Sequence, residues 1–380
     1  MQTRPPKRSG LQARKEPQRI LMIFSSVRFF ITYSHFGELL QSLKKSFNLY
    51  VASVDKSADS EMNMQDISWT YMGFGTFTSY RKLCYLLFPL MALKMSQFCV
   101  KNKIDVVIGF NGGYPQLVAH LASVLSRRPF VVYVRVDHRA IRKMKFGKSV
   151  FAAIWDFSVT WSLKRATHVI TLSHFLTQQT VAWGVSPKNI TIIPFGVDIE
   201  VFKPLKIKEE YPNSVVFIGR WSQEKGIKLL LQIAKRLKHV NFILIGVDDK
   251  KITYRAPNLH SMGIVPHKDL AKYIAFGNVV ISTSLTEGQP MSCLEALACG
   301  KPVVTNRRGG LREFISSDVG WFFDRDNVES AVDTLDKALK DKFLLCQKGR
   351  KAREYAMSFA WEVHAKRLAE VLDIVVKRSK

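Results

Sequence analysis

Short apolar runs alternate with longer amphipathic stretches along almost the whole of this 380-residue chain. This order is typical of βα units, in which each strand of a parallel sheet is followed by a helix that packs on it. Runs that predict strands lie near residues 20–25, 48–53, 105–109, 130–136, 168–172 and 190–193, and then near 214–219, 241–246, 278–283 and 302–305. Helices are expected at 226–238, 268–275, 290–299 and 328–340. The pattern therefore predicts an α/β protein with two doubly wound parallel sheets.

The junction between the two predicted domains is Pro194-Phe195-Gly196-Val197-Asp198, and it runs on into a charged stretch through Glu210. A new series of βα units starts at Ser214. A chain of 380 residues is long enough for two domains with cores of their own. Ligands of such folds bind at the carboxyl ends of the strands, so the expected binding site is a cleft between the domains.

Two carboxylates, Glu287 and Glu295, enclose a short segment that contains glycine and proline. Glu287 falls on the turn after the predicted strand at 278–283, and Glu295 lies inside the next helix. Gly288 lets the backbone approach a ligand closely, and Pro290 suits the first position of the helix. Free amides at that helix start would bind an anion. The set suits a ligand with many hydroxyls and phosphate, such as a nucleotide sugar. The alternative without a function is a helix with one acidic residue at its N-terminus and one on its surface.

Two cations follow the first strand of the second predicted domain, in Ile218-Gly219-Arg220-Trp221-Ser222-Gln223-Glu224-Lys225-Gly226. Arg220 offers a planar fork for phosphate oxygens, and Lys225 offers a mobile point charge. A solvated turn would explain either residue alone. Because the carboxylate-bearing helix lies downstream, the phosphate-binding interpretation is favoured.

These segments together resemble the large retaining glycosyltransferase family 4. The resemblance rests on Gly219–Gly226, on Glu287 and Glu295, on Ala296-Leu297-Ala298-Cys299-Gly300-Lys301-Pro302-Val303-Val304, on Arg307-Arg308-Gly309-Gly310-Leu311-Arg312-Glu313-Phe314-Ile315 and on Ile193 to Phe202. It covers residues 160–325 well and the first half in outline. It implies the GT-B fold, in which two Rossmann-like domains face each other across a cleft.

The residue pattern and the resemblance together divide the chain into four parts. A basic disordered tail is expected over residues 1–17, an N-terminal acceptor-side domain over 18–205, a C-terminal nucleotide-sugar-binding domain over 206–355, and a helix that returns to the N-terminal domain over 356–380.

The same resemblance implies roles for individual residues. Arg220 and Lys225 would hold the donor diphosphate and stabilise the leaving group, and Glu287 would contact the donor sugar; these three form the expected catalytic set. Glu295 would bind the nucleotide ribose. The remaining donor contacts would come from Gly219, Gly288, Gln289, Pro290, Met291, Ser292 and Val265, the last of these beside the base. Family members transfer sugar with retention and without a protein nucleophile or an obligatory metal, so no cofactor is expected.

The first half of the chain departs from the family at two places. The family often has a Gly-Gly loop after its first strand, where this chain has Ser25-Ser26-Val27-Arg28-Phe29-Phe30. A histidine common after a later strand is replaced by Arg135, with Asp137 and His138 just beyond it. Arg28, Arg135, Asp137 and His138 are therefore candidates for the acceptor side of the cleft, while a structural role for Arg28 is an equal alternative.

Other motifs indicate little chemistry. Asp324-Arg325-Asp326 matches the DxD pattern of metal-dependent glycosyltransferases, but a turn with a helix cap explains it. The nine histidines form no metal-binding pattern. The five cysteines form no CxxC pair, which suits a reducing cytoplasm.

The charge of the chain is unusual. Its 57 basic and 31 acidic residues give a formal net charge of +26, which favours an anionic partner. Residues 81–103 carry five bases and no acid around an apolar run at 83–93 that is too short to span a bilayer. Residues 139–165 interleave seven bases and one acid with Phe and Trp. Contact with an anionic membrane and a pair of buried helices with basic ends explain each segment equally well when it is taken alone. The net charge of the whole chain favours peripheral contact with a membrane, and hence a lipid-linked acceptor.

We therefore expect a retaining glycosyltransferase at the cytoplasmic face of a membrane, which moves a sugar from a nucleotide diphosphate donor to a glycan or lipid-linked acceptor. Three alternatives stay open: a soluble transferase with a small-molecule or protein acceptor, a GT-B-like nucleotide-sugar epimerase, and a non-catalytic basic nucleic-acid-binding or scaffold protein. Nucleic acid is the less favoured partner, because no recognition module is present.

Overall fold

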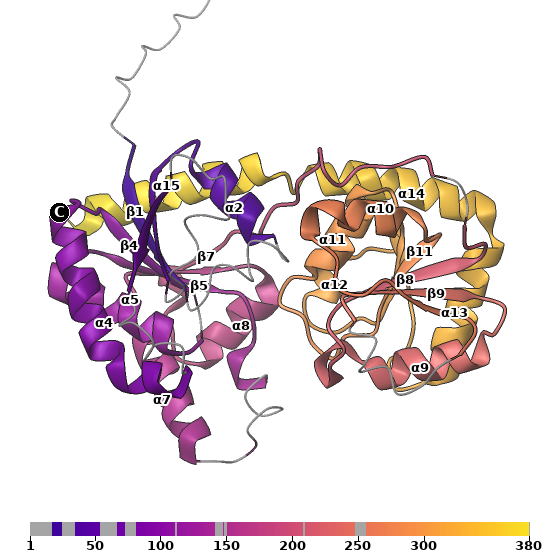
Figure 1. The fold of residues 1–380 in the computed structure, drawn as a ribbon, viewed down its shortest axis with the longest axis horizontal. Coiled ribbons are helices and arrows are strands. Elements are labelled where there is room, and N and C mark those ends of the chain that lie inside the picture. Colours follow the sequence, from indigo (N-terminus) through magenta and orange to yellow (C-terminus); the bar gives the residue numbers. More distant parts are fainter. Residues whose placement is uncertain are drawn as a thin grey trace, which may run out of the picture.

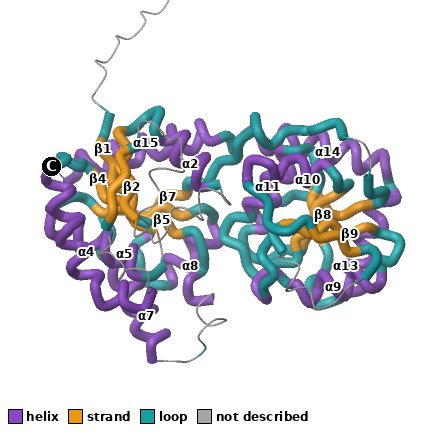
Figure 2. The backbone as a smooth tube through the Cα atoms, viewed as in Figure 1, coloured by secondary structure: helices purple, strands orange, loops and turns teal. Residues whose placement is uncertain are grey.

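The computed structural model describes residues 17–24, 35–53, 67–72, 81–110, 112–140, 147, 150–207, 210–247 and 256–379. They form two α/β units that lie side by side, the first coloured indigo to magenta and the second mostly orange (Figure 1). Each unit has one sheet at its centre with helices around it (Figure 2). The prediction of two doubly wound parallel sheets is confirmed.

The first sheet has seven strands in the order β3-β2-β1-β4-β5-β6-β7, all parallel. They are β1 (Arg19–Ile23), β2 (Asn48–Ser53), β3 (Ser68–Tyr71), β4 (Val106–Phe110), β5 (Phe130–Val134), β6 (His168–Thr171) and β7 (Ile190–Ile192). The helices of this unit are α2 (Phe36–Leu43), α4 (Arg81–Lys101), α5 (Tyr114–Ser126), α7 (Val150–Lys164) and α8 (His174–Ala182), with a 3-10 turn at Pro187–Asn189. Every residue of β4 and β5 is buried, as expected where helices cover both faces of a parallel sheet.

The second sheet has six parallel strands in the order β10-β9-β8-β11-β12-β13. They are β8 (Ser214–Ile218), β9 (Asn241–Ile245), β10 (Leu259–Ser261), β11 (Val279–Ser282), β12 (Val303–Thr305) and β13 (Gly320–Phe322). The helices are α9 (Ile227–Arg236), α10 (Leu270–Ala275), α11 (Met291–Ala298), α12 (Leu311–Phe314), α13 (Val328–Lys340) and α14 (Lys342–Met357), with the 3-10 turns η3 (Gln223–Lys225) and η5 (His267–Asp269). Helix α9 buries Ile227, Leu230, Ile233 and Ala234 on one face, which is why an amphipathic sequence forms it.

Three strands were not predicted from the sequence: β3, β10 and β13. Each has only three or four residues and lies at an edge of its sheet. Most of their side chains are half-buried. A short edge strand needs no continuous apolar run, so no such run marks it in the sequence.

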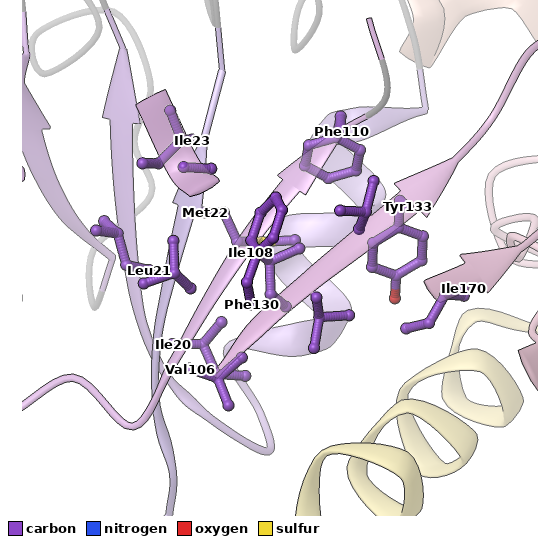
Figure 3. Packing of buried hydrophobic residues seen from close by; sticks show 14 of the residues in the cluster. Ile20, Leu21, Met22, Ile23, Val106, Ile108, Phe110, Phe130, Tyr133 and Ile170 are labelled. Atoms are coloured by element: carbon purple, nitrogen blue, oxygen red, sulfur yellow. The ribbon is translucent and has the colours of Figure 1, made fainter. Parts of the chain in front are cut away.

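The last helix, α15 (Trp361–Ser379), crosses from the second unit to the first (Figure 1). It contributes Trp361, Ala365, Leu368, Leu372 and Val375 to the core of the first unit. Figure 3 shows that the hydroxyl of Tyr133 on β5 points toward this helix, where it lies 3.2 Å from His364 Nε2. The expected domain bounds and the tail over 1–17 stay predictions.

Candidate functional site

The switch point of the second sheet lies at the carboxyl ends of β8 and β11, and we refer to this region, formed by residues 219–225 and 283–288, as the crevice. Strand order reverses between these neighbours, because β9 and β10 lie on one side of β8 and β11 to β13 lie on the other. Such a switch point is where open α/β sheets bind their ligands. Arg220 and Lys225 follow β8, and Glu287 follows β11. The structure thus brings both predicted cations and one predicted carboxylate to the same crevice.

Lys225 and Glu287 form a direct ion pair, with 2.6 Å between Lys225 Nζ and Glu287 Oε1. Only 22% of the lysine side chain and 16% of the glutamate side chain are exposed. Burial alone would lower the pKa of Lys225, but the carboxylate of Glu287 outweighs it, so the pKa is raised above its usual value. The lysine is therefore cationic and held at the crevice near the position of Glu287.

Arg220 is more open to solvent. Its guanidinium pairs with Glu224, which lies in η3. About 65% of the arginine side chain is exposed, so the pair is screened by water and adds little to stability. Because this weak pair is easily exchanged, Arg220 is available to an incoming anion.

Gly226 fixes the turn that carries Lys225. Its φ of +70° lies in the left-handed region, and a Cβ there would lie 1.9 Å from the carbonyl oxygen of Thr283. The Thr283 hydroxyl donates to the Lys225 carbonyl at 2.8 Å, and Leu285 N donates to the Glu224 carbonyl at 2.9 Å. The loops after β8 and β11 are thus locked together, which sets the distance between lysine and glutamate.

The glycines after Glu287 permit close backbone contacts on two sides. A Cβ on Gly288 would lie 2.4 Å from the carbonyl oxygen of Arg135 in the first unit, and one on Gly310 would lie 2.2 Å from the carbonyl oxygen of Gly288. Gly310 N also donates to the Glu287 carbonyl at 2.8 Å. The Glu287–Gly288 turn therefore lies between the Gly309-Gly310 turn and the other unit, at the seam between the two.

Glu295 lies in α11 and is almost fully buried. Its Oε1 accepts a hydrogen bond of 2.8 Å from His267 Nε2. The opposite ring nitrogen, His267 Nδ1, lies 3.0 Å from Glu38 Oε1 on α2 of the first unit. The carboxylate predicted to bind ribose thus belongs to a chain of charged groups that crosses between the units.

The start of α11 differs from the expectation. The helix begins at Met291, so Pro290 is its N-cap residue and not its first helical residue. Met291 N donates to the Gln289 carbonyl, while Cys293 N and Leu294 N donate to the Pro290 carbonyl. These local bonds leave fewer free amides for an anion than the sequence suggested.

The side chain of Gln289 is occupied elsewhere. It holds both backbone groups of Phe195, with the Phe195 amide donating to Oε1 at 2.7 Å and Nε2 donating to the Phe195 carbonyl at 2.9 Å. The backbone of Gln289 stays a predicted donor contact, as does the rest of the backbone from Gly288 to Ser292.

Loops at the ends of β8, β9 and β10 meet beside the crevice. Gly246 N donates to the Gly263 carbonyl at 2.8 Å, and a Cβ on Gly246 would lie 3.1 Å from the Gly219 carbonyl oxygen. Val265 follows Gly263 and is half-buried. The predicted contacts of Gly219 with the donor and of Val265 with the base are compatible with this placement and stay predictions.

The residues predicted for the acceptor side of the cleft have different surroundings in the structure. Arg135 is half-buried at the seam, with its guanidinium 4.8 Å from the ring of Phe36, and desolvation lowers its pKa to about 10. Asp137 Oδ1 accepts from Ala140 N at 3.0 Å and so stabilises a turn. His138 is buried with its ring 4.1 Å from that of Trp183, and its contact with an acceptor stays a prediction. Arg28 lies outside the described residues.

The Asp324-Arg325-Asp326 segment forms a turn before α13. Asn327 caps that helix by accepting from Ser330 N at 3.2 Å, and Asp326 pairs with Arg308 at 2.7 Å. Within the part of the chain that the structure describes, no three His, Cys, Asp or Glu residues are grouped to hold a metal ion. The turn and cap are confirmed, whereas independence from metal stays a prediction.

Two family models match adjacent parts of the chain. The glycosyltransferase family 4 model matches residues 35–201, and the glycosyl transferases group 1 model matches residues 198–358. The chain belongs to the family 4 glycosyltransferases. This family 4 glycosyltransferase has the GT-B fold, because it is similar in structure to the Anabaena protein Alr3699/HepE in complex with UDP and glucose. The TM-score is 0.74, the similarity covers 94% of this chain and 99% of that one, and the sequences are 18% identical. Sucrose-phosphate synthase from Thermosynechococcus elongatus gives 0.78 over 95% and 100%, at 16% identity.

Curated relatives of this family 4 glycosyltransferase are named as components of phosphatidylinositol N-acetylglucosaminyltransferase. The Homo sapiens relative is 29% identical over 194 residues, which are 48% of this chain and 40% of that protein. The Arabidopsis thaliana relative is 26% identical over 293 residues, or 73% and 64%. The chain thus spans from two fifths to under two thirds of the length of these relatives.

Reasoning from the sequence missed the residues that join the two units. His267 and Glu38 come from different units, and so do Glu313 and the amides of His174 and Phe175 that it accepts from. In the sequence, Glu313 stands out only as part of a family motif. Only His267 had a local signal in the sequence, because it directly follows the segment predicted to bind the base.

The ring of His267 makes stability depend on pH. Burial would lower its pKa, but the carboxylates of Glu295 and Glu38 outweigh burial and raise the pKa to about 10. The charged ring therefore stabilises the fold fully below its unfolded pKa of about 6.5, and this stabilisation is lost as the pH rises through about 10. We expect the difference in free energy of unfolding between wild type and His267→Gln to shrink from pH 6 to pH 10 in urea titrations. A difference that grows with pH would contradict a charged ring.

Proposed function

We propose that this chain transfers a sugar from a nucleoside diphosphate donor to a lipid-linked acceptor at a membrane surface, with retention of configuration at the anomeric carbon. The observation that carries the proposal is the Lys225–Glu287 pair at the β8–β11 switch point, with Arg220 beside it. Cations with an open approach suit a diphosphate, and the carboxylates suit hydroxyl groups.

The pair has a direct use in the proposed reaction. An arriving diphosphate offers Lys225 a more highly charged partner than Glu287, so the carboxylate is freed to accept from a sugar hydroxyl. When the bond between the anomeric carbon and the phosphate oxygen breaks, Lys225 and Arg220 stabilise the negative charge on the departing diphosphate. The acceptor oxygen attacks the same face, and its proton passes to the departing phosphate oxygen.

The names of similar proteins support a particular donor and acceptor. The curated relatives are named as components of phosphatidylinositol N-acetylglucosaminyltransferase, and the solved structure of similar fold holds UDP and glucose. A UDP-sugar is therefore our first candidate donor, with N-acetylglucosamine as the sugar and an inositol phospholipid as the acceptor. Four described cysteines are free thiols, which fits the proposed cytoplasmic face of the membrane.

The first unit offers an apolar surface for the proposed membrane contact. On α4, Leu86, Leu90, Leu93 and Val100 are exposed, at a spacing that places them along one side of the helix. On α7, Ile154 and Phe157 are exposed, and α4, α5 and α7 pack side by side. Exposed apolar groups beside Lys101 and Lys164, in a chain of charge +26, suit the surface of an anionic membrane.

No helix among the described residues is both long enough and apolar enough to cross a membrane.

The membrane contact predicts a specific loss. The double change Leu86→Ser and Phe157→Ser should lower flotation with vesicles of phosphatidylcholine and phosphatidylserine by about tenfold or more, because two side chains no longer enter the lipid. Phe343→Ser, which changes an exposed phenylalanine on α14 of the second unit, is the matched control and should float like wild type. Equal flotation with purely neutral vesicles would refute the electrostatic part of the contact.

The donor site is tested by thermal shift with a panel of nucleotide sugars. A ligand that binds only the folded chain raises the melting temperature, so the true donor should stand out. Glu295→Ala should abolish that shift, because the carboxylate proposed for the ribose is gone. An unchanged shift in Glu295→Ala would place the donor elsewhere.

Release of products separates the proposal from its rivals. A transferase releases nucleoside diphosphate and a glycosylated acceptor. An epimerase returns an altered nucleotide sugar, or a free sugar together with nucleoside diphosphate, and glycosylates no acceptor. A nucleic-acid-binding or scaffold protein releases nothing at high protein concentration. Dependence of this release on phosphatidylinositol vesicles separates a lipid acceptor from a soluble one.

A further inference from the structure

The ring of His267 lies between two carboxylates from different units of the protein. His267 is the first residue of η5 in the second unit and leads into α10. Its Nε2 lies 2.8 Å from Glu295 Oε1 on α11, and its Nδ1 lies 3.0 Å from Glu38 Oε1 on α2 of the first unit. All three side chains are largely buried: His267 is 10% exposed, Glu295 is 5% exposed and Glu38 is 14% exposed. The three residues form what we call the interdomain bridge.

The geometry fixes the protonation of the ring. An ionised carboxylate can only accept hydrogen bonds, so each ring nitrogen that faces one has to carry a hydrogen. His267 is therefore a charged imidazolium with one hydrogen bond to each unit. Charge-assisted bonds of this kind are stronger and more directional than neutral ones.

Glu38 is itself fixed by the chain segments that cross between the units. Its second oxygen, Oε2, accepts from Trp361 Nε1 at 2.8 Å, and Trp361 opens α15. A Cβ on Gly196 would lie 2.6 Å from the Trp361 backbone, so the two crossing segments touch at this point. The residue beside Trp361, Ala360, also forms a β-bridge with Val197. A movement of the first unit relative to the second would therefore displace Glu38 from His267.

We propose that His267 is a positioning residue that couples occupancy of the donor site, through Glu295, to the relative arrangement of the two units, through Glu38. This inference rests on the proposed function, in which Glu295 binds the donor ribose. While Glu38 holds the far side of the ring, His267 fixes the carboxylate of Glu295 for the ribose. When the units separate, the ring loses one partner and Glu295 loses its fixed orientation. By reciprocity, a bound donor that orders Glu295 favours the closed arrangement.

The closest isosteric change is Glu38→Gln. Both partners of Glu38, His267 Nδ1 and Trp361 Nε1, are donors, so both carboxylate oxygens accept. A glutamine has one accepting oxygen and can satisfy only one of them. The matched control is Glu362→Gln, because Glu362 lines the same pocket of about 490 Å³ as Glu38 and His267 but pairs with the exposed Lys45.

The test titrates UDP into the full chain by calorimetry. We expect Glu38→Gln and His267→Gln each to raise the Kd for UDP by about tenfold, within the usual range of coupling between sites, although Glu38 belongs to the other unit. The double variant should be no weaker than the weaker single variant, because both changes break one bridge. Glu362→Gln should keep the wild-type Kd.

Each other outcome overturns a defined part of the account. A purely structural role would lower the melting temperature and the fraction of chains that bind, while the Kd of the binding fraction stays at the wild-type value. Additive losses in the double variant would show two independent contributions and refute coupling through one ring. If wild type binds neither UDP nor any other nucleoside diphosphate, the proposed function fails and this inference fails with it; normal UDP binding by Glu38→Gln refutes the inference alone.

Discussion

Lys225→Ala is expected to lower kcat/KM for sugar transfer by about 100- to 1000-fold, the loss seen when one preorganised donor to a developing negative charge is removed. Lys225 is the half-buried cation of the crevice, and its ammonium is already held 2.6 Å from the carboxylate of Glu287. Removal also leaves that carboxylate without its cation, so binding of an anionic donor is further opposed by repulsion. The measurement is the initial rate of nucleoside diphosphate release over a range of donor concentrations.

Two further variants separate charge from fold in this experiment. Lys228→Ala removes an exposed base on α9, three positions along the chain, and should keep the wild-type rate. Combining Lys225→Ala with Glu287→Gln removes the unpaired carboxylate and should recover stability but not activity. A rate for Lys225→Ala within threefold of wild type would show that Lys225 does not take part in the reaction.

Gly226→Ala is expected to destabilise the protein by about 3 kcal/mol, and to lower activity among the molecules that remain folded. The left-handed backbone at φ +70° costs an alanine about 1 kcal/mol. The clash of its Cβ with the Thr283 carbonyl, at a separation of 1.9 Å, forces the two loops apart at the cost of an overpacked core. Urea titration gives the free energy of unfolding.

The matched control for this change is Gly147→Ala. Gly147 also has a left-handed backbone, with φ of +55°, but a Cβ there meets no atom of the described residues within 4 Å. It should cost only the backbone part, about 1 kcal/mol. Equal losses at the two positions would show that the contact between the β8 and β11 loops does not hold Lys225 in place.

The parts of the site that the sequence predicted are those encoded within short segments. Arg220 and Lys225 lie in one turn after β8, and Glu287 follows the next strand across the switch point. In a parallel sheet such residues meet whenever the strands are neighbours, so the motif and the βα order suffice to bring them together. The central strands were predictable for a similar reason, because full burial requires continuous apolar runs.

The missing parts depend on contacts between distant segments. No local pattern connects Glu38 on α2 with His267 before α10, since their meeting depends on how the two units pack. The same holds for Gln289, whose side chain binds the backbone of Phe195 instead of facing a ligand. The short edge strands β3, β10 and β13 were missed because half-buried strands of three or four residues carry no periodic signal.

The central claim is that the β8–β11 crevice holds a nucleotide sugar and releases its diphosphate. The most direct measurement incubates the full chain with UDP-N-acetylglucosamine and vesicles that contain phosphatidylinositol, and follows UDP and glycolipid together by mass spectrometry. We predict that both appear in equal amounts with wild type and that neither appears above background with Lys225→Ala. Equal product formation by Lys225→Ala and wild type would contradict the claim.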